Sequence, residues 1–265
     1  MQGLFASIDW TRPWLAPLLP AAKPLLAAGQ HWRDELNRLA AAAALRNHRQ
    51  LSLQFVAQAD LPANMAYETY ISQTGCVPTR DNLHDFFNAL VWLSYPRMKQ
   101  TLNALQALEI ERAIAQGNAR SVRGKLRDGA TLFDENAALI ISANAGLVED
   151  LRAHRWQEAL LAQRAAFGLS IEVLLFGHAL MEKLVSPYKA ITAHAWVLQV
   201  PEAYFGMTPE QGRAWLDQSA AQYMANGVST SDFTPLPVLG VPGWWPDQRT
   251  EFYADVAVFR PQRKK

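Results

Sequence analysis

The chain has one cysteine among its 265 residues and almost no net charge, with 25 basic residues against 24 acidic ones. A single thiol, Cys76, excludes an internal disulfide and a cysteine-rich zinc site. The chain therefore fits a reducing compartment, and we expect a cytoplasmic location. The one dense basic run, 263–265, is too short to hold a phosphate backbone, so we expect no nucleic-acid partner.

Long apolar runs are also missing. No stretch of about 18 uninterrupted apolar residues occurs, which predicts that the chain has no membrane span. Asp9, Arg12 and four prolines from Pro13 to Pro24 interrupt the apolar N-terminus, which lacks the order of a signal peptide. The GxGxxG, Walker A, GxSxG and CxxC patterns are absent, so the standard nucleotide, serine-hydrolase and redox signatures are excluded.

Half of the residues are hydrophobic and nine are tryptophan, which is enough for a packed core. Alanine- and leucine-rich segments such as 30–48 indicate helices, and turn-forming residues at 134–136 between apolar runs indicate a hairpin. We predict a single compact α+β domain, mostly helical, over residues 1–265. Its predicted parts are a proline-rich N-terminal arm at 1–24, a helical body at 25–228 with a small β-hairpin near 126–142, and an extended, proline-rich C-terminal arm at 229–265.

One predicted helix, within 78–96, carries polar residues on a single side. At about 100° per residue, Asp81, His84, Asp85 and Asn88 share a sector with Trp92. A solvated helix face is usually rich in Lys, Glu or Gln, and this sector has none. The pattern leaves two interpretations open: the wet side of an amphipathic helix, or the lining of a cleft.

A second predicted helix, at 168–185, is apolar nearly all round and should therefore be buried. It contains "FGHALMEK", in which His178 and Glu182 are four residues apart and share a face. A buried histidine and carboxylate need partners. Either the two satisfy each other in the core, or both point into a shared polar pocket.

Histidine and carboxylate at this spacing also suit a divalent metal ion such as zinc, iron or manganese. The candidate ligands are His84, Asp85, His178 and Glu182. Asp134 and Glu135, in the predicted hairpin turn, are further candidates if the hairpin folds over the helices. The pattern is weaker than HExxH, which is absent.

Four motifs together resemble the proteobacterial proteins grouped as domain of unknown function 3025. They are "TRDNLHDFFNALVWLSYPRMK", "LFDEN", "FGHALMEK" and "PLPVLGVPGWWP", and the likeness runs from about residue 60 to 260. The resemblance implies a soluble bacterial protein and supplies no catalytic residue, because the family has no established activity. Family members often have glycine after the DEN turn, where this chain has Ala137.

We predict a metal-assisted hydrolase or lyase that acts on a small polar substrate, with a histidine or carboxylate as base and a metal or Arg80 as electrophilic helper. The candidate catalytic residues are Arg80, Asp81, His84, Asp85, Asn88, His178 and Glu182. The alternative is a non-catalytic binding or structural protein, in which the buried polar residues form a structural network and Trp244 and Trp245 anchor a partner. The sequence does not fix the substrate, the metal or the oligomeric state.

Overall fold

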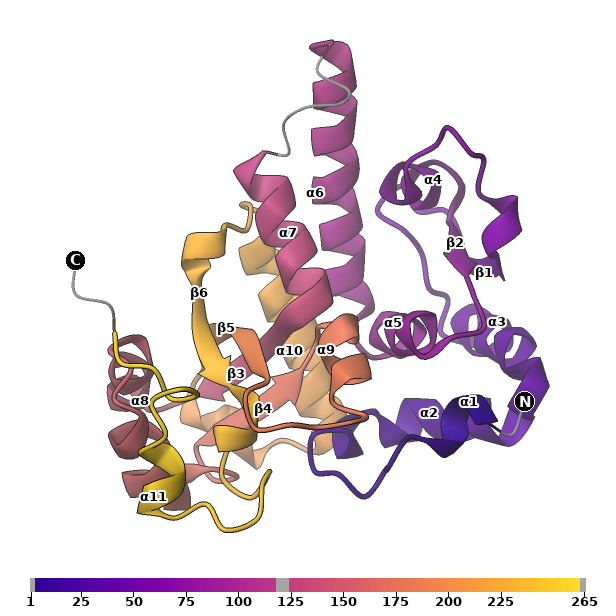
Figure 1. The fold of residues 1–265 in the computed structure, drawn as a ribbon. Helices are drawn as coiled ribbons and strands as arrows, with labels where there is room; N and C mark the ends of the chain where they lie inside the picture. Colours follow the sequence, from indigo (N-terminus) through magenta and orange to yellow (C-terminus); the bar gives the residue numbers. More distant parts are fainter. Residues whose placement is uncertain (1–2, 118–123, 263–265) are drawn as a thin grey trace. The chain divides into compact units, whose positions relative to one another are not determined.

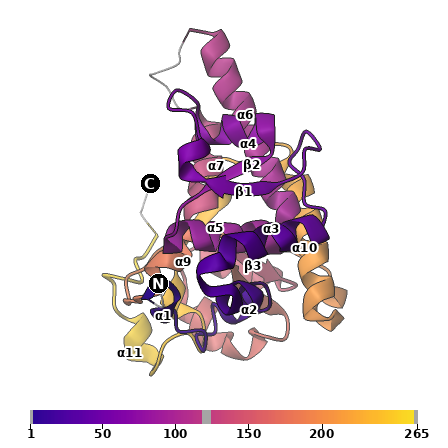
Figure 2. The same cartoon turned by 90° about the vertical axis from the view of Figure 1, so that its right-hand side faces the viewer.

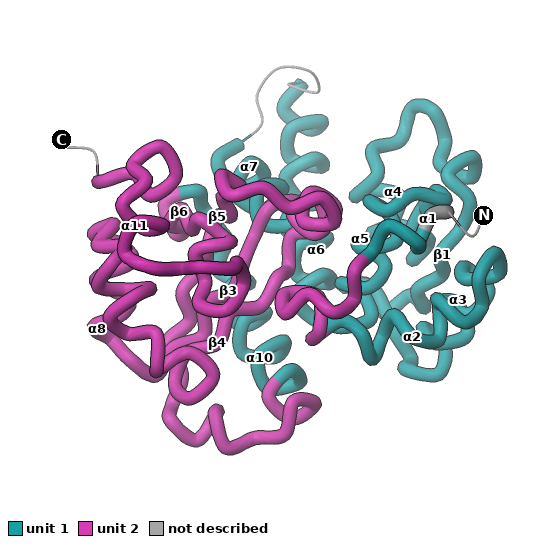
Figure 3. The backbone as a smooth tube through the Cα atoms, turned by 60° about the horizontal axis from the view of Figure 1, so that its bottom comes forward, with its two compact units in different colours: residues 1–8, 18–134, 213–230 teal, residues 9–17, 135–212, 231–265 magenta. Residues whose placement is uncertain are grey.

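The structure is a computed structural model that describes residues 3–117 and 124–262 (Figure 1). Two compact units make up the chain (Figure 3). Unit 1 consists of residues 1–8, 18–134 and 213–230, and unit 2 of residues 9–17, 135–212 and 231–265. Helices predominate and the strands form two small sheets, which confirms the predicted mostly helical α+β class. The single domain over residues 1–265 remains a prediction from the sequence.

Unit 1 is a set of helices with one short parallel strand pair (Figure 2). Two of its helices, α7 and α10, cross the boundary between the units. Its elements are α1 (Gly3–Ala6), α2 (Leu19–Ala28), α3 (Trp32–Ala42), β1 (Gln54–Ala57), α4 (Tyr67–Thr74), β2 (Cys76–Thr79), α5 (Leu83–Ser94), α6 (Pro96–Ala115), α7 (Lys125–Asn136) and α10 (Pro209–Met224).

Helix α5 lies in the core of unit 1. Asn82 caps its N-terminus, since the Asn82 side chain accepts a hydrogen bond of 2.8 Å from the Asp85 N–H. Phe86 is fully buried. Its ring centroid lies 4.5 Å from that of Phe5 and 5.6 Å from that of Trp32. The contacts of buried Phe86 with buried Trp32 and half-buried Phe5 hold α5 against α3 and the N-terminal segment.

Helices α6 and α10 are joined by a buried carboxylate. Asp217, 4% exposed, accepts hydrogen bonds from the N–H groups of Arg97 (3.0 Å) and Met98 (2.9 Å) in the first turn of α6. The carboxylate takes the place of a capping residue, because the first N–H groups of a helix have no partner within it. Burial raises the pKa of Asp217 to about 6, against the opposing effects of the two N–H donors and the Arg97 charge.

Unit 2 is built on a four-stranded mixed sheet in the order β4-β3-β5-β6. The strands are β3 (Ala137–Ser142), β4 (Ile171–Leu175), β5 (Thr192–Gln199) and β6 (Phe233–Pro237). Strand β3 is buried along its whole length, which explains its continuous apolar run. It pairs antiparallel with β4 and parallel with β5.

Unit 2 also contains α8 (Ala145–Arg152), a π-helical turn at Gln157–Ala162, α9 (His178–Lys183), α11 (Thr250–Tyr253) and several short 3-10 helices. The described part of the C-terminal segment packs on this unit. Its prolines are accommodated because β6 is an edge strand, which needs fewer N–H donors than a central one. Trp244 is 9% exposed and its ring centroid lies 5.8 Å from that of Trp14.

The predicted β-hairpin near 126–142 is wrong. Residues 125–136 form helix α7, and 137–142 form β3, whose partners lie far along the chain. Gly129 does not make a turn: a Cβ atom there would come within 2.5 Å of the Val228 carbonyl oxygen, so glycine allows close packing inside unit 1. Asp134, Glu135 and Asn136 end the helix.

Two other boundaries differ from the sequence prediction. The predicted helix at 168–185 is β4 followed by the short helix α9, so His178 starts a helix and does not lie in the middle of one. The predicted N-terminal arm at 1–24 is not extended, because α2 begins at Leu19. Pro20 fits the first turn of α2, where its missing N–H has no helical acceptor.

The buried carboxyl of Asp217 predicts a pH dependence of stability. Its raised pKa means that the folded state binds the proton more tightly than the unfolded state between about pH 4 and 6. The free energy of unfolding contributed by this group is therefore present at low pH and falls by about 3 kcal/mol as pH rises through this window.

Urea unfolding of wild type and Asp217→Asn at several pH values between about 4.5 and 7.5 measures the effect. We expect the stability of wild type relative to Asp217→Asn to rise as pH falls. A difference between the two proteins that does not change with pH would contradict the assignment.

Candidate functional site

The predicted polar side of α5 is divided among separate contacts within unit 1. Asp81 lies before the helix and its side chain is exposed. Its Oδ1 accepts hydrogen bonds of 3.0 Å from Trp32 Nε1 and from Arg33 Nη2. Asp81 therefore ties the loop before α5 to α3.

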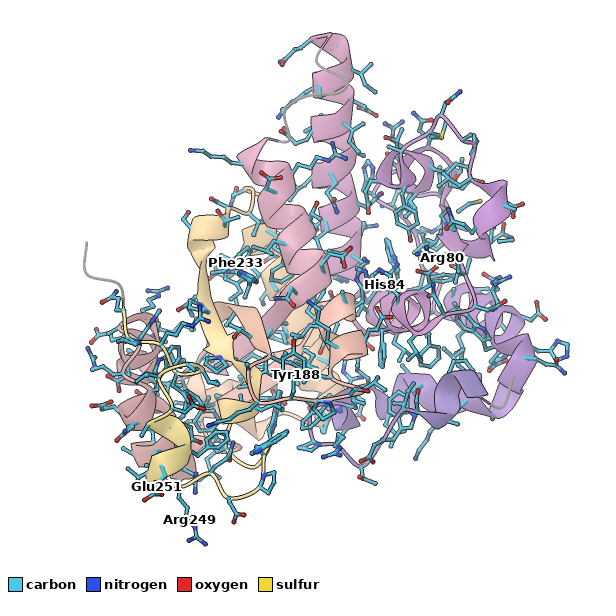
Figure 4. All side chains as sticks on the ribbon, viewed as in Figure 1. Arg80, His84, Tyr188, Phe233, Arg249 and Glu251 are labelled. Atoms are coloured by element: carbon cyan, nitrogen blue, oxygen red, sulfur yellow. The ribbon has the colours of Figure 1, made fainter. Side chains whose placement is uncertain are left out.

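Asp85 is paired with the arginine five residues before it. Its buried carboxylate accepts hydrogen bonds from the Arg80 backbone N–H (2.6 Å), Nε (2.9 Å) and Nη2 (3.0 Å). The Arg80 guanidinium remains half-exposed at the loop before α5 (Figure 4). The arginine supplies the positive charge that a metal at Asp85 would otherwise supply.

Asn88 and Asp134 both bind a buried lysine. Lys99, 4% exposed on α6, donates to both oxygens of Asp134 at 2.6 and 2.9 Å and to Asn88 Oδ1 at 2.8 Å. Its Nζ also lies 5.3 Å from the ring centroid of Trp92. These three hydrogen bonds can use all three N–H groups of the ammonium. The ring of Trp92 further stabilises its positive charge.

The network continues to helix α4. Asn88 Nδ2 lies 3.1 Å from the hydroxyl oxygen of Tyr67. Burial is the largest cause of a pKa of Tyr67 well above its ordinary value, and the charges of Glu68, Asp85 and Asp134 add to it. The phenol is therefore protonated at neutral pH.

Glu68, the next residue of α4, is held by Asn103 of α6. Asn103 Nδ2 donates to the backbone oxygen (2.9 Å) and to Oε2 (2.8 Å) of Glu68. Burial raises the pKa of Glu68, and the positive charge of Lys99 opposes this shift. Both Tyr67 and Glu68 are half-buried, so the network reaches from the core of unit 1 toward its surface.

Sequence reasoning missed the α6 part of this network. Lys99, Asn103 and Gln106 are all buried and follow the 4,3 spacing of one helix face. The same spacing of apolar residues was used to predict core faces, but polar residues at these positions were not considered. A lysine and two amides at core spacing are the signal that could have revealed a buried polar network.

In unit 2, His178 and Glu135 come together. His178 is 4% exposed, and its Nε2 lies 3.6 Å from Glu135 Oε2. Gly177 makes this possible, because a Cβ atom there would lie 2.4 Å from the Ala137 nitrogen. Glycine thus lets the start of α9 approach the junction between α7 and β3.

The end of α7 is also held by β5. Asn136 Nδ2 lies 3.0 Å from His194 Nδ1 and 3.1 Å from the Thr192 carbonyl oxygen. Burial lowers the pKa of His194, with the charge of Lys183 as a second cause. A neutral His194 can accept the hydrogen bond from Asn136, which fixes the residue next to Glu135.

The predicted site residues therefore fall into distinct groups. Asp85 is with Arg80, Asn88 and Asp134 are with Lys99, and His178 is with Glu135. His84 is half-buried in the first turn of α5 (Figure 4). It belongs to unit 1 and His178 to unit 2, so the shared metal site predicted for them stays a prediction. Glu182 is half-buried one turn after His178 on α9.

Residues 53–263 match the model of a family described as "Protein of unknown function (DUF3025)". The chain belongs to this family. The match confirms the resemblance carried by the four motifs, and the description assigns no activity to DUF3025 proteins. No curated protein and no solved structure matches the chain.

Across the described residues of this DUF3025 protein, no helix combines the length and the apolar character needed to cross a membrane. This finding agrees with the predicted lack of a span.

The buried ion pair of Lys99 and Asp134 predicts strong coupling between the two side chains. Lys99→Met or Asp134→Leu alone removes one charge of the buried pair and should lower the free energy of unfolding by about 3–5 kcal/mol. The double variant Lys99→Met/Asp134→Leu should recover most of this loss. Urea unfolding of the three variants measures the coupling.

Arg38→Met is the control, since it removes an exposed ion pair with Glu35 in the same unit and should change stability little. Additive losses in the Lys99/Asp134 double variant would show that the two side chains do not depend on each other.

The close approach of Gly177 gives a second prediction. Gly177→Ala should destabilise the protein by about 1–3 kcal/mol, because the new Cβ atom would meet backbone atoms of Asn136 and Ala137. Gly206→Ala is the control, since a Cβ atom at that position of unit 2 has no neighbour within 4 Å. Thermal unfolding compares the two variants, and equal melting temperatures would contradict the packing argument.

Proposed function

We propose that this DUF3025 protein binds a divalent transition-metal ion through His178 and Glu135 and uses it in a hydrolytic or lytic reaction on a small polar substrate. The supporting observation is the 3.6 Å separation of His178 Nε2 and Glu135 Oε2. This is too long for a hydrogen bond. It is close to the roughly 3.4 Å between two ligand atoms at tetrahedral positions around zinc, which follows from metal–ligand distances of about 2.1 Å.

The residue types at this pair also support a metal, because histidine and carboxylate side chains are common ligands of divalent transition metals. Neutral imidazole is the form that binds a metal. Glu182 is one helical turn from His178, at the i+4 position, and is the proposed third ligand or general base.

The chemistry proposed for the site is metal-assisted attack by water or metal-assisted elimination. A bound metal would polarise a carbonyl or phosphoryl oxygen of the substrate and lower the pKa of a bound water molecule. His178 and Glu135 would hold the ion, and Glu182 would serve as a third ligand or accept a proton as general base. The proposal leaves out Asp85 and Asp134, because Arg80 and Lys99 already neutralise them.

The alternative of a binding or structural protein is favoured by a different observation, the internal pairing of the polar residues in unit 1. Asn88, Lys99 and Asp134 satisfy one another, as a structural network would. A partner site anchored by Trp244 and Trp245 is less favoured, because Trp244 is buried against Trp14. A partner surface on the C-terminal segment would depend on the half-buried Trp245. The predicted cytoplasmic location and small-molecule substrate stay predictions.

Metal analysis tests the proposed function. Protein purified without added chelator should carry a stoichiometric transition metal or bind added zinc. His178→Ala and Glu135→Gln should lose it, since loss of one ligand of a metal site sharply lowers affinity. His31→Ala, which removes an exposed histidine with a 75% exposed side chain, is the control for adventitious binding.

Wild type that contains no metal and binds zinc no more tightly than His178→Ala would reject the proposal and favour the structural alternative. His84→Ala belongs in the same series, because its metal content tests the prediction from the sequence that His84 is also a ligand.

A further inference from the structure

Asn226 is the only asparagine in the sequence that is followed by glycine. It lies in the turn after the C-terminal end of α10 and is exposed to solvent. Gly227, which follows with φ +101°, has no Cβ atom to crowd its backbone nitrogen. This nitrogen can reach the side-chain carbonyl carbon of Asn226 by closing a five-membered ring, so the two residues form a reactive pair.

The reaction open to this pair is an intramolecular attack on the side-chain amide. The Gly227 nitrogen loses its proton and bonds to the Asn226 side-chain carbonyl carbon, while the bond from that carbon to the side-chain nitrogen breaks and ammonia leaves. Water then adds to one of the two carbonyl carbons of the cyclic imide and opens the ring. The product is aspartate or isoaspartate, and solvent water is the only co-reactant.

The folded turn restrains this attack. The Gly227 N–H donates a hydrogen bond of 2.8 Å to the carbonyl oxygen of Met224, the last residue of α10. The nitrogen must give up this hydrogen bond before it can bond to Asn226. Helix ends open more often than the core of a protein, so the rate in the folded state depends on the opening of this last turn.

We propose that Asn226 is a site of spontaneous deamidation and that the hydrogen bond from Gly227 to Met224 slows the reaction in the folded protein. The inference is independent of the proposed metal site, because Asn226 belongs to unit 1 while His178 and Glu135 belong to unit 2.

Deamidation alters the contact between the end of α10 and helix α7. The new carboxylate lies just after the C-terminal end of α10, where the helix dipole disfavours a negative charge. Isoaspartate also lengthens the backbone and displaces the residues that follow. Those residues pack closely on α7: a Cβ atom at Gly129 would lie 2.5 Å from the Val228 carbonyl oxygen, and one at Gly227 would lie 3.3 Å from Leu126 Cδ1. The modified protein is therefore less stable than the fresh protein.

Peptide mass spectrometry of the full chain, aged in mildly alkaline buffer, measures the reaction at each asparagine. Asn64 is the internal control, because it is also exposed but is followed by Met65. We expect Asn226 to react about tenfold faster than Asn64 or more, since glycine leaves the attacking nitrogen uncovered. Equal rates at the two asparagines would overturn the proposal.

Ageing in guanidinium chloride at the same pH tests the protecting hydrogen bond. Unfolding removes this bond, so the rate at Asn226 relative to that at Asn64 should rise severalfold over its value in the folded protein. An unchanged ratio would show that the Met224 carbonyl does not restrain Gly227.

Asn226→Gln is the matched variant for the effect on stability. Glutamine keeps a side-chain amide at this exposed position but would have to close a larger ring, so it reacts far more slowly. Aged wild type should melt at a lower temperature than fresh wild type, whereas aged and fresh Asn226→Gln should melt together. An equal loss of melting temperature in both proteins would contradict the expected effect at the α10–α7 contact.

Discussion

The ion pair between Lys99 and Asp134 is the interaction on which the organisation of unit 1 depends. It lies almost completely out of water, and an unpaired charge there would cost several kcal/mol. The pair fixes α7 against α6, and the third N–H of Lys99 fixes Asn88 of α5. Since a single ammonium joins three helices, its charge also sets the direction of the hydrogen bonds that lead to Tyr67 on α4.

The two units thus use polar residues in different ways. In unit 1, Asp85 is paired with Arg80 and Asp134 with Lys99, and the hydrogen bonds around Lys99 form a directed network. In unit 2, His178 faces Glu135 at a distance that suits two ligands better than a hydrogen-bonded pair. The glycine before His178 and the hydrogen bond between Asn136 and His194 hold the backbone on both sides of this pair.

Sequence reasoning succeeded where the signal was local. Gly75 is a stop signal in the sequence, and in the structure it caps α4 in the left-handed conformation with φ +77°. Thr208 and Gln211, three residues apart at the start of α10, form the capping box that their spacing favours. The family was also recognisable from its motifs.

Prediction failed where distant pairing decides the structure. The run from Ala137 to Ile141 looks like half of a hairpin, but its strand partners begin at Ile171 and Thr192. The segment before "FGH" was predicted to be helical, but Ile171–Leu175 form strand β4. Lys99 was not predicted to lie in a buried network, because a lysine is usually solvated and its burial depends on Asp134, 35 residues later.

Anomalous diffraction at the zinc edge, from crystals of the full chain grown with zinc, tests whether His178 and Glu135 are metal ligands. We expect an anomalous peak within about 2.2 Å of both His178 Nε2 and Glu135 Oε2. A zinc-soaked crystal with no peak there, and with the two side chains in a direct hydrogen bond, would contradict it.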